Sequence, residues 1–322
     1  MKTLIDTREE SPTERIISEE AISTDVVAAG QKRANKYLIA IGIVMTIAAI
    51  VYLLFAYGEP DKIIKILNKD HHLFYWMLLV GFLAEMVAGS MGMGYGVICT
   101  TILLILNVSP PVISASIHSA ESFTTAAGSI SHYKLGNVNK KLTKLLAIPA
   151  IIGAVIGALA LTYLGEKYAK MTKPVIAAYT MYLGIRILMN AYKNKKTNGV
   201  RKKTNISLLG FIGGFIDSFG GGGWGPLVTG TFIKNGRTPR YVIGSSTLAK
   251  FILTFVSAIT FIFTIGIHHW NIVAGLLIGG IVTAPFSAML TSRLPVRKMF
   301  IVVGIVVIIM SLITLYRAIF LP

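Results

Sequence analysis

Cysteine and acidic residues are scarce in this sequence, and their scarcity limits what the chain can be. The single cysteine, Cys99, excludes an internal disulfide. Charged residues make up only 14% of the chain, whereas 54% of its residues are hydrophobic. Half of the fourteen acids lie in residues 1–30, a polar and acidic stretch that has none of the features of a signal peptide. This balance is typical of an integral membrane protein with a polar tail.

Several functional motifs are also missing. The glycine-rich segments lack the Lys-Ser/Thr ending of a phosphate-binding loop, and no serine–histidine–acid arrangement is apparent. The pairs His71-His72 and His268-His269 have no third ligand at a spacing that suits a metal ion. We therefore expect no enzyme activity, no cofactor and no metal. The net charge of +17 does not indicate nucleic acid, because the basic residues cluster in short loops between apolar segments, as in cytoplasmic loops of membrane proteins.

Apolar segments are the main feature of the sequence. Those long enough to cross a bilayer are Tyr37–Tyr57, Val112–Ser131, Leu145–Leu164, Pro174–Ala191, Tyr241–Phe263, Ile272–Leu290 and Met299–Phe320. A further segment, Leu73–Leu106, is too long for one span and is interrupted by glycines.

The most informative pattern is a glycine-rich break that occurs twice, 129 residues apart. The first copy runs from Gly81 to Gly96 and the second from Gly210 to Gly225. Without a gap, Tyr95 matches Trp224, and the register continues well beyond the break. Paired, glycine-broken segments in the two halves of a membrane protein indicate the binding site of a transporter.

Each broken segment is either one kinked crossing or a hairpin that enters and leaves on the same side. With hairpins in both halves, the basic residues concentrate on one side, whereas kinked crossings divide them almost equally. Because cytoplasmic loops are rich in Lys and Arg, the counts favour two re-entrant hairpins. The cytoplasmic segments are then the N-terminus and the loops around Lys32–Lys36, Lys134–Lys144, Lys193–Lys203, Lys234–Arg240 and Arg293–Lys298.

We therefore predict an all-α integral membrane protein with two inverted repeats. Each repeat has a glycine-broken re-entrant helical hairpin and three transmembrane helices, and one extra transmembrane helix precedes both. The predicted divisions are an acidic cytoplasmic tail, the first helix, repeat 1, a basic cytoplasmic linker and repeat 2, at residues 1–36, 37–58, 73–192, 193–204 and 205–322.

The glycine loops are candidate anion sites. Pro226 follows the second loop directly, and proline is favoured in the first turn of a helix, so we expect a helix to begin there and its counterpart to begin near Val97. Helix N-termini present free N–H groups and partial positive charge to an anion. Alternatively, the glycines only allow close helix packing, although four consecutive glycines exceed what a helix crossing needs.

Charges inside the apolar segments are few. Glu121 and Lys250 hold the same position in the two repeats, and a charge within a span indicates a functional site. Either the two form a structural ion pair, or Lys250 attracts an anion while Glu121 or His118 carries a coupled proton. Glu85 and Asp217 lie on the ascending arms of the hairpins, where each is a candidate proton carrier, hairpin cap or gate.

The double break, with Gly92-Met-Gly-Tyr-Gly96 and Gly220-Gly-Gly-Gly-Trp-Gly-Pro226, resembles the TauE/SafE-type sulfite exporters, also called toluene sulfonate uptake permeases. The stretch Ser131–Val138 is similar to the family's basic loop motif, and its second copy departs from that motif at Gly266–Trp270. The resemblance covers about residues 73–320. It implies a secondary transporter of a bacterial inner membrane that exports sulfite or organosulfonates, driven by an ion or proton gradient. A passive anion channel of the same architecture is the alternative.

We expect the anion at mid-membrane between the glycine loops. The predicted substrate-binding residues are Gly92, Gly94, Tyr95, Gly96, Ser116, His118, Gly221, Gly222, Gly223, Trp224, Gly225, Ser245, Ser246, Thr247 and Lys250. The predicted coupling residues are Glu121, Glu85 and Asp217. The expected partners are a small sulfur anion and the lipid bilayer. The small-residue face Gly153–Gly157 serves either a homodimer or packing within the chain.

Overall fold

The computed structural model describes residues 71–134, 136–192, 204–266, 269–290 and 296–320, and all its regular secondary structure over these residues is helical. The predicted tail, the predicted first span and residues 193–203 lie outside the described residues. The helices are α3 (His71–Met91), α4 (Tyr95–Ile105), α5 (Pro110–Lys134), α6 (Lys140–Lys167), α7 (Ala169–Tyr192), α8 (Ile206–Gly220), the π-helical segment η1 (Gly225–Thr229), α9 (Gly230–Lys234), α10 (Pro239–Ile265), α11 (Trp270–Leu290) and α12 (Val296–Phe320).

Both glycine-rich segments break the helix at the predicted place. Gly92 and Gly94 have φ angles of 72° and 118° between α3 and α4, and Gly221 has a φ of 69° between α8 and η1. Residues with a Cβ rarely adopt these angles, which is why glycine occupies the turns. The helices after the breaks begin at Tyr95 and Gly225, within two residues of the predicted positions.

The second broken segment folds back on itself. Asn235, just after α9, donates a 2.8 Å hydrogen bond to Thr204, just before α8. Gly213 also packs directly on Val228, which follows it by fifteen residues. Because a continuous helix would separate those two residues by about 22 Å, α8 and the η1–α9 arm form a hairpin.

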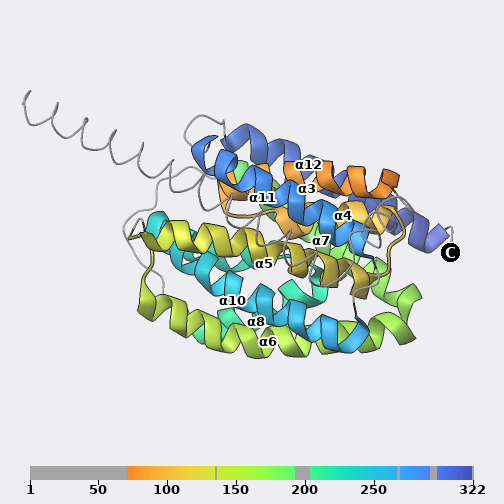
Figure 1. Ribbon diagram of the computed structural model, residues 1–322, viewed down its shortest axis with the longest axis horizontal. Coiled ribbons are helices and arrows are strands. Elements are labelled where there is room, and N and C mark those ends of the chain that lie inside the picture. Colours follow the sequence, from red (N-terminus) through yellow and green to blue (C-terminus); the bar gives the residue numbers. More distant parts are fainter. Residues whose placement is uncertain (1–70, 135, 193–203, 267–268, 291–295, 321–322) are drawn as a thin grey trace, which may run out of the picture.

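Each hairpin packs on a helix of the other half. Figure 1 shows α6 and α8 in one layer, α3, α11 and α12 in another, and α5 and α10 between them. Gly81 on α3 brings that helix against the backbone of Leu276 on α11, and Gly210 on α8 does the same with Leu146 on α6. The two contacts are similar, since Gly81 and Gly210 are related by the repeat spacing of 129 residues and Leu146 and Leu276 differ from that spacing by one residue. Gly81 and Gly210 therefore allow close helix packing, which was the alternative interpretation of the glycines. The glycines of the loops instead allow the chain to turn.

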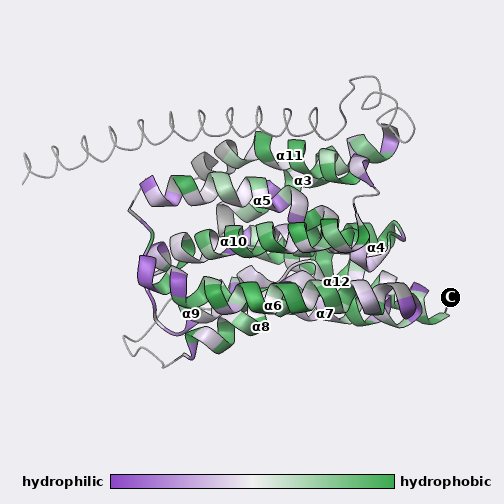
Figure 2. Cartoon of the chain, turned by 60° about the horizontal axis from the view of Figure 1, so that its bottom comes forward, coloured by the Kyte–Doolittle hydropathy of each residue, from purple (hydrophilic) through white to green (hydrophobic). Residues whose placement is uncertain are grey.

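The chain is a multi-pass membrane protein. Four described helices are long and apolar enough to cross a membrane, namely α3, α6, α10 and α12, over the windows His72–Gly89, Lys140–Gly165, Arg240–Ile265 and Arg297–Phe320. Figure 2 shows hydrophobic residues along the helices and hydrophilic residues gathered at their ends. The predicted spans at 112–131 and 174–191 lie within α5 and α7, which are long helices of more mixed polarity.

The small-residue face at Gly153–Gly157 is used inside the chain. Gly153 and Gly157 lie on α6, and each leaves room for the backbone of α8, at Phe211 and Phe215 respectively. This face was predicted to serve either a homodimer or packing within the chain, and the structure shows it packed within the chain.

Candidate functional site

Helices α5 and α10 place their polar faces against each other at the centre of the molecule. Ser114, His118, Glu121 and Thr125 recur on α5 at intervals of three and four residues, which puts them on one face. Lys250 Nζ on α10 bonds Glu121 Oε1 on α5, and one turn further the hydroxyls of Thr125 and Thr254 lie 3.4 Å apart. Equivalent residues of the two repeats therefore meet, and they mark the local two-fold axis.

Asp217 caps the second glycine loop. It is fully buried on α8, and its Oδ1 accepts a 2.7 Å hydrogen bond from the backbone N–H of Trp224. Such a carboxylate at the start of a helical arm satisfies a donor that would otherwise be unpaired. The corresponding position on α3 is Ala88, so the first hairpin has no equivalent carboxylate.

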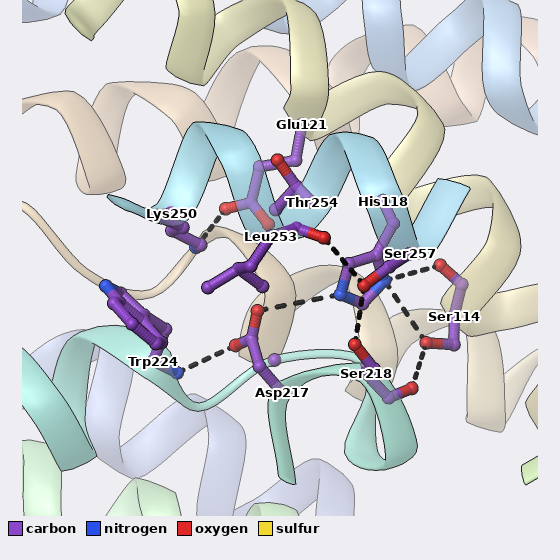
Figure 3. Close-up of polar contacts among 12 residues, drawn as sticks. Ser114, His118, Glu121, Asp217, Ser218, Trp224, Lys250, Leu253, Thr254 and Ser257 are labelled. Carbon is purple, nitrogen blue, oxygen red and sulfur yellow. Dashed lines mark hydrogen bonds and ion pairs between the residues drawn. The ribbon is translucent and has the colours of Figure 1, made fainter. Parts of the chain in front are cut away.

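His118 connects α5 to that cap. Its Nε2 lies 3.5 Å from Asp217 Oδ2, and its Nδ1 lies 2.8 Å from the backbone oxygen of Ser114 (Figure 3). Both His118 and Asp217 are fully buried. Four sequence-predicted residues thus come together around one point between α5, α8 and α10, namely His118, Glu121, Asp217 and Lys250.

Negative charge exceeds positive charge in this cluster. Glu85 on α3 is buried beside Thr124 and within electrostatic range of Glu121 and Lys250. Three carboxylates therefore surround one lysine. Glu121 Oε2, Asp217 Oδ2 and His118 Nε2 are buried and make no hydrogen bond. Because an unpaired ion is costly in a nonpolar interior, this arrangement is suited to taking up protons.

The two glycine loops touch each other. Gly96 packs on Gly222, since a Cβ added at Gly96 would lie 2.7 Å from the Gly222 Cα. The equivalent contact joins Gly225 to Met93, where an added Cβ would lie 2.8 Å from the Met93 Cα. Only glycine permits these approaches of backbone to backbone. The predicted loop residues are therefore brought together, one hairpin against the other.

The two matched aromatic residues anchor their loops to different helices. Tyr95 donates from its hydroxyl to the Leu276 carbonyl on α11 at 3.1 Å. Trp224 donates from its indole Nε1 to the Ser246 hydroxyl on α10 at 2.8 Å. Both side chains are almost fully buried. Ser246, a predicted site residue, thus holds the second loop, and its hydroxyl also lies 2.7 Å from that of Thr229.

The other predicted hydroxyls do not join the cluster. Ser245 accepts from the backbone N–H of Asn139 at 2.8 Å, which fastens the start of α6. Ser116 is buried but lies two positions from His118 along α5, on the opposite side of the helix. Thr247 bonds the carbonyl of Ile243 on its own helix at 2.9 Å.

Other polar residues of the site escaped the sequence analysis. Tyr179 on α7 donates to the Gly222 carbonyl at 2.8 Å, and Thr100 on α4 donates to the Gly221 carbonyl at 2.8 Å. Ser218 and Ser257 share a 2.6 Å hydrogen bond between α8 and α10. Thr100 and Thr229 are matched by the repeat spacing, and this match could have identified both as residues of the site. Nothing in the sequence around Tyr179 indicates its role.

Comparison with known proteins identifies the family. The profile of the sulfite exporter TauE/SafE family matches residues 77–314. The chain belongs to this family. The resemblance seen in the two glycine breaks is thereby confirmed, and so is the conclusion that the protein is a membrane transporter and not an enzyme.

Relatives of this TauE/SafE-family transporter occur in two bacteria, Bacillus subtilis and Haemophilus influenzae. It is 37% identical to the probable membrane transporter protein YtnM of Bacillus subtilis over 234 residues, which cover 70% of this chain and 77% of the relative. It is 26% identical to a probable membrane transporter protein of Haemophilus influenzae over 241 residues, covering 69% and 90% of the two chains. No solved structure matches the chain.

Proposed function

We propose that this TauE/SafE-family protein is a proton-coupled transporter of a small sulfur oxyanion, either sulfite or an organosulfonate, in a bacterial inner membrane. The observation that carries the proposal is the ion pair between the partly buried Lys250 and the buried Glu121 beside two touching glycine loops. The sulfur oxyanion itself comes from the family, whose profile is that of a sulfite exporter.

The positions of the loops support two inverted repeats. The loops predicted to be cytoplasmic meet at one end, where Asn137 bonds Arg240 and Arg297 lies over the ring of Tyr192. The loops predicted to be external meet at the other end, where Lys173 bonds Asn107 at 2.6 Å. Both hairpins then enter the membrane from opposite faces and meet in the middle, with the N-terminus in the cytoplasm. Irregular backbone at that depth is tolerated only where it is buried or lines a pathway.

Lys250 is the cation available to the substrate, but Glu121 already neutralises it. A substrate anion that approached would face the charges of Glu121, Glu85 and Asp217 as well as that of Lys250. Protonation of Glu121 removes one negative charge and releases Lys250. The anion and the Glu121 carboxylate therefore compete for the same ammonium, and anion binding requires a proton. This competition couples the two ions without a separate gate.

Ligand-dependent thermal stabilisation tests this proposal in purified protein. Isethionate is a suitable probe, because the charge of a sulfonate does not change near neutral pH. Its stabilisation of the wild type should weaken as pH rises, with the apparent Kd increasing about tenfold per pH unit once Glu121 is deprotonated in the free protein. The Glu121→Gln variant should bind isethionate with no such pH dependence, since Lys250 then has no competing carboxylate from that residue.

The double variant Glu121→Gln/Lys250→Gln is the matched control, because it removes both charges and leaves no broken pair. It should fold and show no stabilisation by isethionate. Retained stabilisation in this variant would place the anion elsewhere. A matched carboxylate, 3-hydroxypropanoate, tests the preference for sulfur oxyanions. In proteoliposomes, an isethionate flux that a proton gradient does not alter would make the protein a passive channel instead.

A further inference from the structure

His118 Nε2 and Asp217 Oδ2 face each other at 3.5 Å, and in the neutral form of His118 both atoms are hydrogen-bond acceptors. The backbone carbonyl of Ser114 can only accept, so His118 Nδ1, which lies 2.8 Å from it, must carry the hydrogen. In the neutral imidazole, Nε2 is then an acceptor. It points at Asp217 Oδ2, another acceptor, from 3.5 Å. Two buried acceptors in this position repel each other unless a proton lies between them.

The other oxygen of the same carboxylate holds the second glycine loop. Asp217 Oδ1 accepts from the Trp224 N–H at 2.7 Å, and neither Asp217 Oδ2 nor His118 Nε2 makes a hydrogen bond. The state of the His118–Asp217 pair is therefore passed directly to the backbone of the loop. Among the residues that the structure describes, the other titratable groups around the pair are Glu121 on α5, Lys250 on α10 and Tyr179 on α7.

We propose that one proton shared between His118 Nε2 and Asp217 Oδ2 latches the second glycine loop onto α5. When the proton is present, a charge-assisted hydrogen bond joins α5 of the first repeat to α8 and, through Asp217, to Trp224. When it leaves, the two acceptors repel and the loop is released. Asp217 is a positioning residue in this device, which controls the conformation of one hairpin and does not require an anion to be bound.

The first hairpin offers a built-in comparison. It has Ala88 where the second has Asp217, so its loop has no such latch. The native Cys99 lies on α4 of this hairpin, and its repeat equivalent in η1 is Val228. Both side chains are fully buried. Val228 packs across the loop on Gly213, so it is exposed only when the second hairpin opens.

Thiol labelling of the two hairpins tests the latch. The wild type reports on the first hairpin through Cys99, and the exchanged variant Cys99→Val/Val228→Cys reports on the second. Each rate is divided by the rate of the same thiol in denatured protein at the same pH. Between pH 6 and pH 8.5, in the absence of any anion substrate, labelling of the introduced thiol should rise by about tenfold or more, as loss of a hydrogen bond to a charged group implies. Labelling of Cys99 should not follow that rise.

Two substitutions of Asp217 in the exchanged background should have opposite effects. Asp217→Asn keeps an oxygen for the Trp224 N–H and gains an N–H that can donate to His118 Nε2, so it should label slowly at every pH. Asp217→Ala removes both contacts and should label quickly at every pH. Ser257→Ala is the matched control, because it removes a hydrogen bond between two serine hydroxyls, neither of which titrates. This variant should keep the pH response.

The latch is overturned if Asp217→Asn retains the wild-type pH response, or if both hairpins respond to pH alike. Should the exchanged variant fail to fold, hydrogen exchange of the Trp224 amide in unmodified protein replaces it, after correction for the intrinsic pH dependence. Protection of that amide should fall as pH rises. Protection that is constant over the same range contradicts the latch. None of these readouts uses an anion, so failure of the proposed substrate class would leave them unaffected.

Discussion

At the scale of single residues, the site depends on how buried charges are balanced. Glu121 and Lys250 occupy equivalent positions of the two repeats and carry opposite charges, so the local symmetry brings each to its partner. Their direct contact is what the structural ion-pair interpretation predicted. It is equally what a competition between carboxylate and substrate requires, so the contact alone does not separate the two interpretations.

Stability measurements on variants of this pair distinguish a balanced ion pair from an isolated carboxylate. Lys250→Gln leaves the Glu121 carboxylate buried without its cation, and breaking a buried pair in this way costs about 3–5 kcal/mol. We expect a marked fall in melting temperature at pH 8 that shrinks as the pH is lowered, because protonated Glu121 needs no cation. In Glu121→Gln/Lys250→Gln the fall in melting temperature should be much smaller and independent of pH.

The control for this series is Lys167→Gln, which removes an exposed lysine at the end of α6. It should leave the melting temperature unchanged, because exposed charges contribute little. A double variant as unstable as Lys250→Gln itself would show that Lys250 stabilises the fold through groups other than Glu121.

At the scale of elements, the two hairpins depend on glycines of two kinds. Gly92, Gly94 and Gly221 supply backbone angles that other residues rarely adopt, whereas Gly96 lies within the first turn of α4 and supplies space. An added Cβ at Gly96 would lie 2.5 Å from the Gly221 oxygen, an approach that a real side chain does not make. The loops can touch only because that Cβ is absent.

Gly96→Ala should therefore separate the loops. We expect it to lower the melting temperature by an amount corresponding to about 1–3 kcal/mol, as overpacking does, and to abolish isethionate stabilisation. Gly230→Ala is the matched control, since Gly230 is also helical and an added Cβ would meet nothing closer than 3.6 Å. It should be neutral or slightly stabilising, because alanine favours the helix. Equal melting temperatures for the two variants would mean that the contact between loops does not constrain the fold.

Much of the fold and part of the site could be predicted at this scale. The matched glycines gave the position of both breaks, and the polar faces of α5 and α10 identified His118, Glu121 and Lys250. For Ser116 and Ser245 the structure shows a buried side chain and a hydrogen bond that attaches the start of α6, and substrate binding by these two residues stays a prediction. The packing of each hairpin on a helix of the other repeat, α3 on α11 and α8 on α6, could not be predicted from the spacing of residues. It depends on which apolar faces meet in three dimensions.

At the scale of the whole molecule, the ends of the helices separate into two groups. The loops rich in basic residues lie together, and Asn137 from one of them bonds Arg240 from another. The connections with fewer basic residues lie at the far end, where Gly165 on α6 packs on Pro111 on α5. This separation is compatible with the repeat if each hairpin enters and leaves the membrane on the same side. Each half then crosses the membrane an odd number of times, and the basic loops of both halves lie at one end.

The separation of basic residues predicts an orientation of the chain in the membrane, and single thiols can measure that orientation. In a Cys99→Val background, Lys196→Cys places a thiol in the basic linker, and Lys170→Cys places one in the first turn of α7 at the opposite end. In intact cells, an impermeant thiol reagent should label Lys170→Cys but not Lys196→Cys, and inside-out vesicles should give the reverse, since cytoplasmic loops carry the excess of Lys and Arg. Labelling of both thiols from the same side would rule out a single crossing by α7 and with it the inverted repeat. The opposite orientation at both positions would retain the repeat but place the N-terminus outside, so that Asp217 and the second hairpin would enter from the external face.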